Sequence, residues 1–155
     1  MTADEHCKLL GRLVGNLQSL EFILRGFLQE LPSARPIGIP PGTDLYAFPV
    51  GHVLPESEMT SWDTLSVLIE KFNREMRKRG APGVDARIVE VRDALAHGRV
   101  SSSSPDENLR LLKFSKPSRR RVRIVFNEQM TKAWFEDQMR RARQAIIVVH
   151  KAMVE

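Results

Sequence analysis

The chain has 155 residues and a net charge of +5, and 42% of its residues are hydrophobic. This length and balance predict one globular domain over residues 1–155, with a core that needs neither disulfides nor metals. The single cysteine, Cys7, excludes an intramolecular disulfide and a cysteine-based zinc site, and it fits a reducing compartment. The basic balance favours anionic partners, nucleic acid first.

No stretch of the sequence predicts a secreted or membrane protein. The first residues, Met1–Glu5, are polar and acidic, unlike a secretory signal. The longest apolar run near the C-terminus, residues 145–149, is far too short to span a bilayer. We therefore expect a cytoplasmic protein that makes no membrane contact.

A long amphipathic helix is predicted over residues 5–31, because apolar residues recur there mostly at steps of three and four. Its expected buried stripe consists of Leu10, Leu13, Leu17, Leu20, Leu24, Phe27, Leu28 and Leu31. Pro32 ends this helix, and residues 32–60 then hold six of the nine prolines. They predict a long irregular loop, which in a small domain is usually functional or mobile.

Two more helices are predicted after this loop. Thr60–Asp63 offers a hydroxyl cap and an acidic first turn, and a basic cluster precedes Gly80 at the other end. The expected buried stripe of this helix consists of Trp62, Leu65, Leu68, Ile69, Phe72 and Met76. Pro82 and Asp85 open a third helix that ends at Gly98. Its expected core face consists of Val84, Ile88, Val91 and Leu95.

After a flexible segment, Ser101–Pro105, the apolar period changes from that of a helix to that of a strand. Leu109–Phe114 can pair with the alternating residues 121–126, in a hairpin inserted over residues 108–127. The last helix is predicted over residues 128–153, with a stripe formed by Met130, Trp134, Ala142, Ile146, Val149 and Met153. The predicted fold is mainly α: an antiparallel four-helix bundle with a proline-rich loop and a small basic β-hairpin.

The segment Arg92–Arg99, with the sequence RDALAHGR, concentrates most of the chain's potential chemistry. An arginine and a histidine held together can bind a phosphodiester and move its protons without a metal. His97 falls in the last turn of the predicted helix, where free carbonyls favour the protonated imidazole. An alternative stays open: Arg92 and Asp93 can be an ordinary surface pair, and His97 a residue that caps the helix end.

The helical order, with Arg92, Asp93 and His97 on the third helix, resembles the HEPN superfamily of RNA-cleaving and nucleotide-binding domains. The motif of that family is Arg, about four to six residues and His, often with Asn, Asp or His after the Arg. A toxin subgroup has Tyr two places after the His, where this chain has Arg99. The resemblance implies a metal-independent ribonuclease acting as a homodimer. It also implies a defence or toxin–antitoxin setting, with an antitoxin or another protein partner.

In such an enzyme His97 takes a proton from the ribose 2′-OH or gives one to the leaving 5′-oxygen. Arg92 holds the phosphate, and Asp93 orients the imidazole. On an ideal helix Arg92 and His97 lie about 140° apart, since each residue turns about 100°. Either the helix unwinds at Gly98, or a second copy completes the site, as the resemblance implies. The alternatives are a non-catalytic module that binds RNA, a nucleotide or a protein, and a structural interaction domain.

A second candidate region is strongly basic: residues 110–123 contain seven basic residues and no acidic one. They would track a nucleic-acid backbone, or else protect a sheet edge from aggregation. The expected nucleic-acid-binding residues are Arg99, Arg110, Lys113, Lys116, Arg119, Arg120, Arg121 and Arg123. Only Phe114 and Phe126 lie nearby, so base stacking is weakly indicated. The sequence has neither metal-ligand spacing nor a phosphate loop, so we expect no metal or cofactor.

Overall fold

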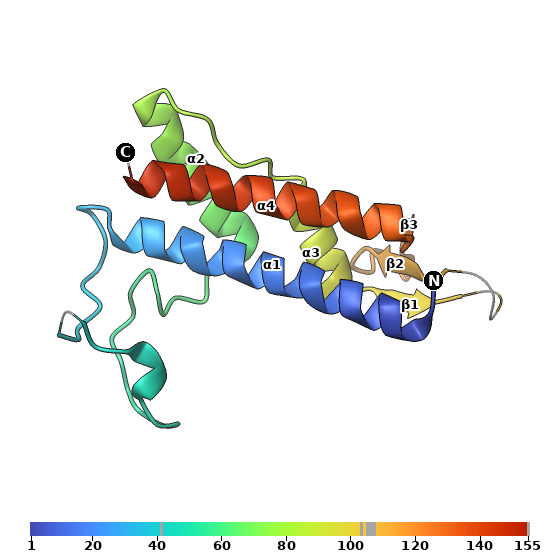
Figure 1. Ribbon diagram of the computed structural model, residues 1–155, viewed down its shortest axis with the longest axis horizontal. Helices are drawn as coiled ribbons and strands as arrows, with labels where there is room; N and C mark the ends of the chain where they lie inside the picture. The colour runs from blue at the N-terminus through green and yellow to red at the C-terminus, as the bar shows by residue number, and fades with distance from the viewer. Residues whose placement is uncertain (41, 103, 105–107, 155) are drawn as a thin grey trace. The chain divides into compact units, whose positions relative to one another are not determined.

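The computed structural model describes residues 1–40, 42–102, 104 and 108–154. Within these residues the elements follow the order α1 (Ala3–Gln29), η1 (Leu45–Ala47), α2 (Leu65–Arg79), α3 (Ile88–His97), β1 (Arg99–Ser101), β2 (Arg110–Phe114), β3 (Ile124–Gln129) and α4 (Lys132–Val154) (Figure 1). They form two compact units. Unit 1 contains residues 1–20 and 85–147, and unit 2 contains residues 21–84 and 148–155, so α1 and α4 contribute to both.

Unit 1 has a core formed by one face of its sheet and by three helices. Helix α3 packs on β2, where Leu111 is buried. The His6 ring of α1 meets the Phe135 ring of α4 edge-on, with centroids 5.3 Å apart. His6 is only 6% exposed, and burial lowers the pKa of its imidazole. The other buried apolar residues of this unit include Leu13, Leu17, Leu20, Ile88, Val91, Ala94, Met130, Trp134, Met139, Ala142 and Ala145.

The sheet of unit 1 has three antiparallel strands in the order β1-β2-β3. Arg99 of β1 lies opposite Leu112, and Leu112 lies opposite Asn127 of β3. The register of β2 and β3 shifts between Lys113 and Phe114, which face Phe126 and Ile124 respectively. This irregularity gives β3 one extra residue at the end nearest the hairpin connection.

The prediction of a mainly α, antiparallel four-helix bundle is wrong, because the structure combines four helices with a three-stranded sheet. The expected hairpin is present as β2 and β3, but the chain also extends after Gly98 and adds β1 to the sheet. The helices are not all antiparallel either. His6 meets Phe135 near the starts of α1 and α4, and Gly26 approaches Met153 near their ends, so these two helices run in the same direction (Figure 1).

Unit 2 is built on the end of α1 and on α2. The Phe27 and Phe72 rings meet edge-on, with centroids 4.9 Å apart. Arg25 fastens the residues before α2 to α1: its guanidinium donates hydrogen bonds to the carbonyls of Ser61 at 3.0 Å and Asp63 at 2.8 Å. The buried residues of α2 are Leu65, Leu68, Ile69, Phe72 and Met76, as its periodicity predicts.

Helix α2 begins later than predicted, and this changes the environment of Trp62. The cap is Thr64, whose hydroxyl accepts a hydrogen bond from the N–H of Val67, rather than a residue at 60–61. Trp62 therefore precedes the helix and is 99% exposed, so its expected place in the buried stripe is wrong. At the other end Gly80 has φ 65°, the left-handed cap that the sequence predicts.

In the part of the chain that the structure describes, no helix combines the length and the hydrophobicity of a membrane span. The same residues include no group of three or more His, Cys, Asp or Glu side chains placed to hold a metal ion. Of the expected flexible segment Ser101–Pro105, residues 103 and 105 lie outside the described residues.

Candidate nucleic-acid interface

The predicted catalytic residues lie at the end of α3, and Gly98 fixes how the chain leaves that helix. Its N–H donates a hydrogen bond of 2.7 Å to the carbonyl of Ala94. A Cβ atom at position 98 would lie 2.3 Å from that carbonyl oxygen and 2.8 Å from Leu111 Cδ1. Gly98 is extended, with φ −81°, so its small size rather than a left-handed conformation allows this packing. The chain therefore passes directly from His97 into β1.

Helix α3 is regular through His97, so the expected unwinding at Gly98 does not include the histidine. Arg92 and His97 thus keep the helical separation of about 140° between their directions. His97 is exposed, and Arg92 is partly exposed. A single chain does not bring the guanidinium and the imidazole together on one side of the helix, and a complete site would need a second copy.

Asp93 is engaged by two cations. Its carboxylate lies 3.6 Å from Nζ of Lys113 on β2 and 3.9 Å from the guanidinium of Arg92. Within the described residues it forms no ion pair with His97, although the two residues are four apart on one helix. The carboxylate therefore links α3 to the sheet, and Lys113 is part of that link.

The connection between β2 and β3, residues 115–123, is held by hydrogen bonds of its own. The Ser115 N–H donates to the carbonyl of Arg123 at 2.8 Å, and the Arg123 N–H donates to Ser115 Oγ at 3.0 Å. Ser118 and Arg121 exchange two backbone hydrogen bonds, of 2.8 and 2.9 Å. Only two residues remain at the tip, so the connection is a tight, ordered hairpin. Together with β2 and β3 we call it the basic hairpin, residues 110–129.

The two residues at this tip, Arg119 and Arg120, have φ angles of 49° and 61°. Positive φ at both central residues is typical of the type I′ turn, which glycine and asparagine usually occupy. An L-residue in this region costs roughly 1–2 kcal/mol. This turn could not be predicted from the residue types, because neither tip residue is a glycine or an asparagine. Arginine here points to a use for the side chain, since its backbone conformation is unfavourable.

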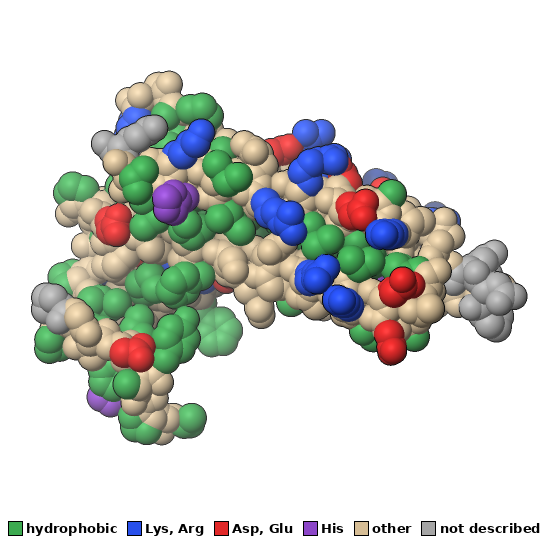
Figure 2. All heavy atoms as spheres, in the orientation of Figure 1, with side chains coloured by type: hydrophobic (Ala, Val, Ile, Leu, Met, Phe, Trp, Pro, Cys, Tyr) green, Lys and Arg blue, Asp and Glu red, His purple; other side chains and the backbone are tan. Residues whose placement is uncertain are grey.

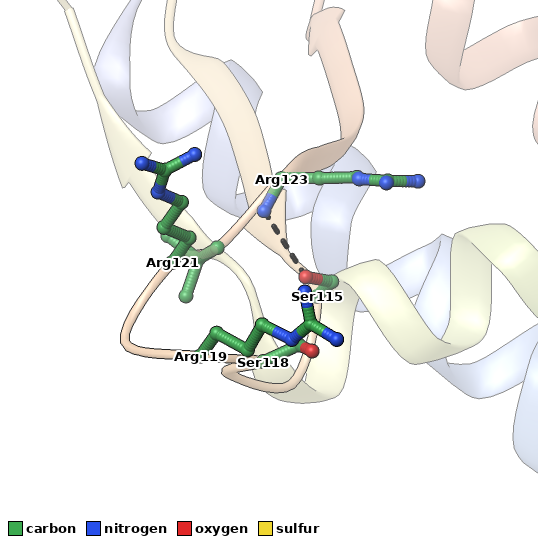
Figure 3. A pocket seen from close by; sticks show the side chains of 6 residues that line it. Ser115, Ser118, Arg119, Arg121 and Arg123 are labelled. Atoms are coloured by element: carbon green, nitrogen blue, oxygen red, sulfur yellow. Dashed lines mark hydrogen bonds between the residues drawn. The ribbon is translucent and has the colours of Figure 1, made fainter.

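An open hollow of about 950 Å³ lies along this connection, lined by Ser115, Ser118, Arg119, Arg121, Val122 and Arg123. Figure 3 shows the Arg119 guanidinium beside Ser115 and Ser118, while the side chains of Arg121 and Arg123 extend to opposite sides. Guanidinium groups and hydroxyls are suitable donors for the oxygens of a phosphate. Ser115 and Ser118 are therefore candidate phosphate-binding residues. They could not be predicted from the sequence, because serine is common in loops that bind nothing.

The remaining predicted residues are spread over the sheet and its connection. Lys116 and Arg120 are exposed in the connection. Arg110 donates a 2.7 Å hydrogen bond to Oδ1 of Asn127 across the strands. The Arg99 guanidinium lies over the Phe114 ring, 5.4 Å from its centroid. The structure thus groups seven of the predicted residues on the outer side or the end of the sheet, and Lys113 on the side of α3.

The helical surface of unit 1 is different in character. Figure 2 shows Lys and Arg side chains interspersed with Asp and Glu over α1 and α4. Asp137, for example, pairs with both Arg140 and Arg141. A surface of mixed sign attracts a polyanion less strongly than a surface of one sign. The basic hairpin, which has no acidic residue between 110 and 123, is therefore the better candidate.

Comparisons with known proteins do not place this chain in a family. No family model matches the sequence. A search of curated proteins and a search of solved structures also find no match.

Proposed function

We propose that this protein binds RNA through the phosphate backbone, with the basic hairpin as its main contact. The observation that carries the proposal is the hollow at the hairpin connection, which Arg119, Arg121 and Arg123 line together with two serines, and where the Arg119 guanidinium lies beside both hydroxyls (Figure 3). RNA is chosen over other polyanions because the Arg92–His97 motif resembles that of the HEPN superfamily. Neutralised phosphates release counterions, so such binding weakens steeply as salt rises.

The alternative role of these cations, protection of a sheet edge, fits their positions less well. The edge strands are β1 and β3, and β3 carries the sequence IVFNEQ without any Lys or Arg. Five of the eight predicted cations lie in the connection that precedes β3, two lie on the central strand β2, and only Arg99 lies on an edge strand, β1. Charges that guard an edge are expected on the edge strand itself. The arginine positions therefore favour ligand binding.

Salt-dependent binding of a fluorescent RNA tests this proposal. Arg121→Gln with Arg123→Gln should weaken binding and should reduce the slope of log K against log salt by about 0.7 for each lost phosphate contact. The matched control, Arg140→Gln with Arg143→Gln on α4, makes the same charge change and should leave the slope nearly unaltered. Equal effects of both pairs would show that net charge alone binds RNA, and would contradict the assignment to the hairpin.

Cleavage of the bound RNA is a second candidate function. The position of His97 favours it: the imidazole is exposed at the last residue of α3. After Gly98 the chain enters β1, which belongs to the same sheet as the basic hairpin. His97 would remove the proton of the 2′-OH, whose oxygen attacks the phosphorus as the bond to the 5′-oxygen breaks, and water would protonate the leaving 5′-oxygen. Arg92 of a second copy would stabilise the charge on the phosphate oxygens. The products would be a 2′,3′-cyclic phosphate and a 5′-hydroxyl.

Incubation with RNA in EDTA, followed by analysis of the new ends, tests cleavage. His97→Ala and Arg92→Ala should each abolish the cyclic phosphate product. If one copy supplies each group, mixing the two variants should restore about a quarter of the wild-type rate, because about half of the exchanged dimers keep one intact site. Binding without any cyclic phosphate would leave a non-catalytic RNA-binding protein.

A further inference from the structure

The outward face of the three-stranded sheet is a second surface with the chemistry of a ligand site. Paired residues of neighbouring strands point to the same face, and successive residues point to opposite faces. Leu111 is buried and Lys113 reaches Asp93 of α3, so their face is turned toward the core. By register the opposite face carries Arg99, Ser101, Arg110, Leu112, Phe114, Ile124, Asn127 and Gln129.

This outward face exposes apolar surface between cations. Ile124 is 58% exposed, and Phe114 beside it is only half-buried. The Arg99 guanidinium lies 5.4 Å from the centroid of the Phe114 ring, within the range of a cation–π contact. A nucleic-acid base can stack on an aromatic ring and on a guanidinium plane alike. The Arg99 guanidinium lies over one face of the Phe114 ring, so a base can stack on the guanidinium or replace it on the ring.

The charges on this face select an anionic occupant. By register it carries two cations, Arg99 and Arg110, and none of its residues in β1, β2 or β3 is acidic. The amides of Asn127 and Gln129 and the hydroxyl of Ser101 are donors and acceptors suited to base edges. Phe114 is followed directly by Ser115, which lines the hollow of the basic hairpin. Stacking groups and phosphate-binding groups thus adjoin each other.

We infer that this face binds single-stranded RNA, with one or more bases stacked on Phe114 and Arg99 while the basic hairpin holds neighbouring phosphates. The inference rests on the proposed RNA binding and adds the state of the strand. Bases within a duplex present only their edges, so a stacking surface distinguishes unpaired RNA from paired RNA. Base stacking on aromatic rings tolerates any sequence, so the face selects unpaired structure more than base identity.

The test compares the affinity for a labelled single strand of about ten nucleotides with the affinity for the same sequence in a duplex. Phe114→Leu should weaken single-strand binding by about 5- to 100-fold and leave duplex binding within about twofold. Phe114→Tyr keeps the ring and should retain the affinity. Phe126→Leu, which removes a ring by register on the opposite face, is the matched control and should have little effect.

A second variant keeps the test valid if Phe114→Leu does not fold. Arg99→Lys keeps the positive charge but removes the planar guanidinium, so it should weaken single-strand binding without altering the salt slope. Equal affinity for both RNAs, unaffected by these variants, would overturn the inference and leave the proposed RNA binding intact. A wild-type protein that binds neither RNA at low salt would remove both. A dimer that dissociates on Ile124→Arg would assign the face to a second copy and overturn the inference.

Discussion

Asp93 and Lys113 form an ion pair between α3 and the middle strand of the sheet, with 3.6 Å between the carboxylate Oδ2 and Nζ. The side chains are 41% and 23% exposed, so solvent screens the pair. Its importance is positional, because it holds a carboxylate between two cations, Arg92 and Lys113, on the side of the sheet that faces α3.

Asp93→Asn should therefore strengthen RNA binding, by about two- to fivefold at low salt, because Arg92 and Lys113 lose their competing anion. The free energy of unfolding should change by less than about 1 kcal/mol, as expected for a solvent-exposed pair. Anisotropy titrations and urea unfolding measure the two effects. Glu90→Gln, on the exposed side of the same helix, is the control. Weaker binding together with lost cleavage would show instead that Asp93 orients His97.

Gly98→Ala should destabilise the protein by about 1–3 kcal/mol, because the added Cβ would overlap the Ala94 carbonyl and Leu111. Gly15→Ala is the matched control: it lies inside α1, and a Cβ there meets nothing within 4 Å. That change should stabilise the protein by up to about 1 kcal/mol. Urea unfolding of both variants measures the difference. Two changes of the same sign would contradict this account of the turn after α3.

The stability of the protein should fall as pH decreases below about 6.5, the pKa of an unfolded histidine. Burial lowers the pKa of His6 in the folded state, and its Nδ1 has no hydrogen-bond partner among the described residues. The unfolded chain therefore binds a proton first, and stability declines until the pH passes the folded pKa. The loss is at most about 1.4 kcal/mol per pH unit.

His6→Leu removes this titration and keeps an apolar group against Phe135. Unfolding of wild type and variant at about pH 7.5 and pH 5.5 should show a smaller pH effect in the variant. Carboxylates titrate equally in both proteins, so the difference isolates His6. The same pH dependence in both would rule out the buried imidazole as the cause.

Replacement of the hairpin tip by Arg119→Asn with Arg120→Gly should stabilise the protein by about 1–2 kcal/mol, because both new residues accept a positive φ. RNA affinity should fall at the same time, since two cations leave the connection. Thermal unfolding and anisotropy together measure this trade-off. A variant that is less stable would contradict the strain at the tip, and a variant that binds RNA as well as the wild type would show that neither arginine contributes to binding.

The helices could largely be predicted from the sequence, because their signal is local. Periodic leucines predict a helix over residues 5–31, and α1 spans Ala3–Gln29 with Leu13, Leu17 and Leu20 buried. The error at Trp62 is also local. Residues 60–61 and Thr64 all offer hydroxyl caps, so the local pattern does not distinguish between them. In the structure Thr64 caps the helix, and Arg25 of α1 binds the carbonyls of Ser61 and Asp63 ahead of it.

The sheet and the interface depended on contacts that no local pattern reveals. Strand β1 is three residues long and exists because it pairs with β2, so the sequence offered only a serine-rich segment after Gly98. The contact of Arg99 with Phe114 follows from that pairing. The basic residues were visible as a cluster, whereas their division between the core side of the sheet and its outward face needed the register.

The contacts of Arg25 and Gln29 hold the two ends of the proline-rich loop against α1. Besides the Arg25 hydrogen bonds, Gln29 donates to the carbonyl of Arg35 at 2.8 Å and accepts from the N–H of Met59 at 3.3 Å. Both ends of the loop are thereby tied to α1, and the closure entropy grows only slowly with the length between them. The tip around Gly51 is thus a natural place to insert an affinity tag or a fluorophore without disturbing α2.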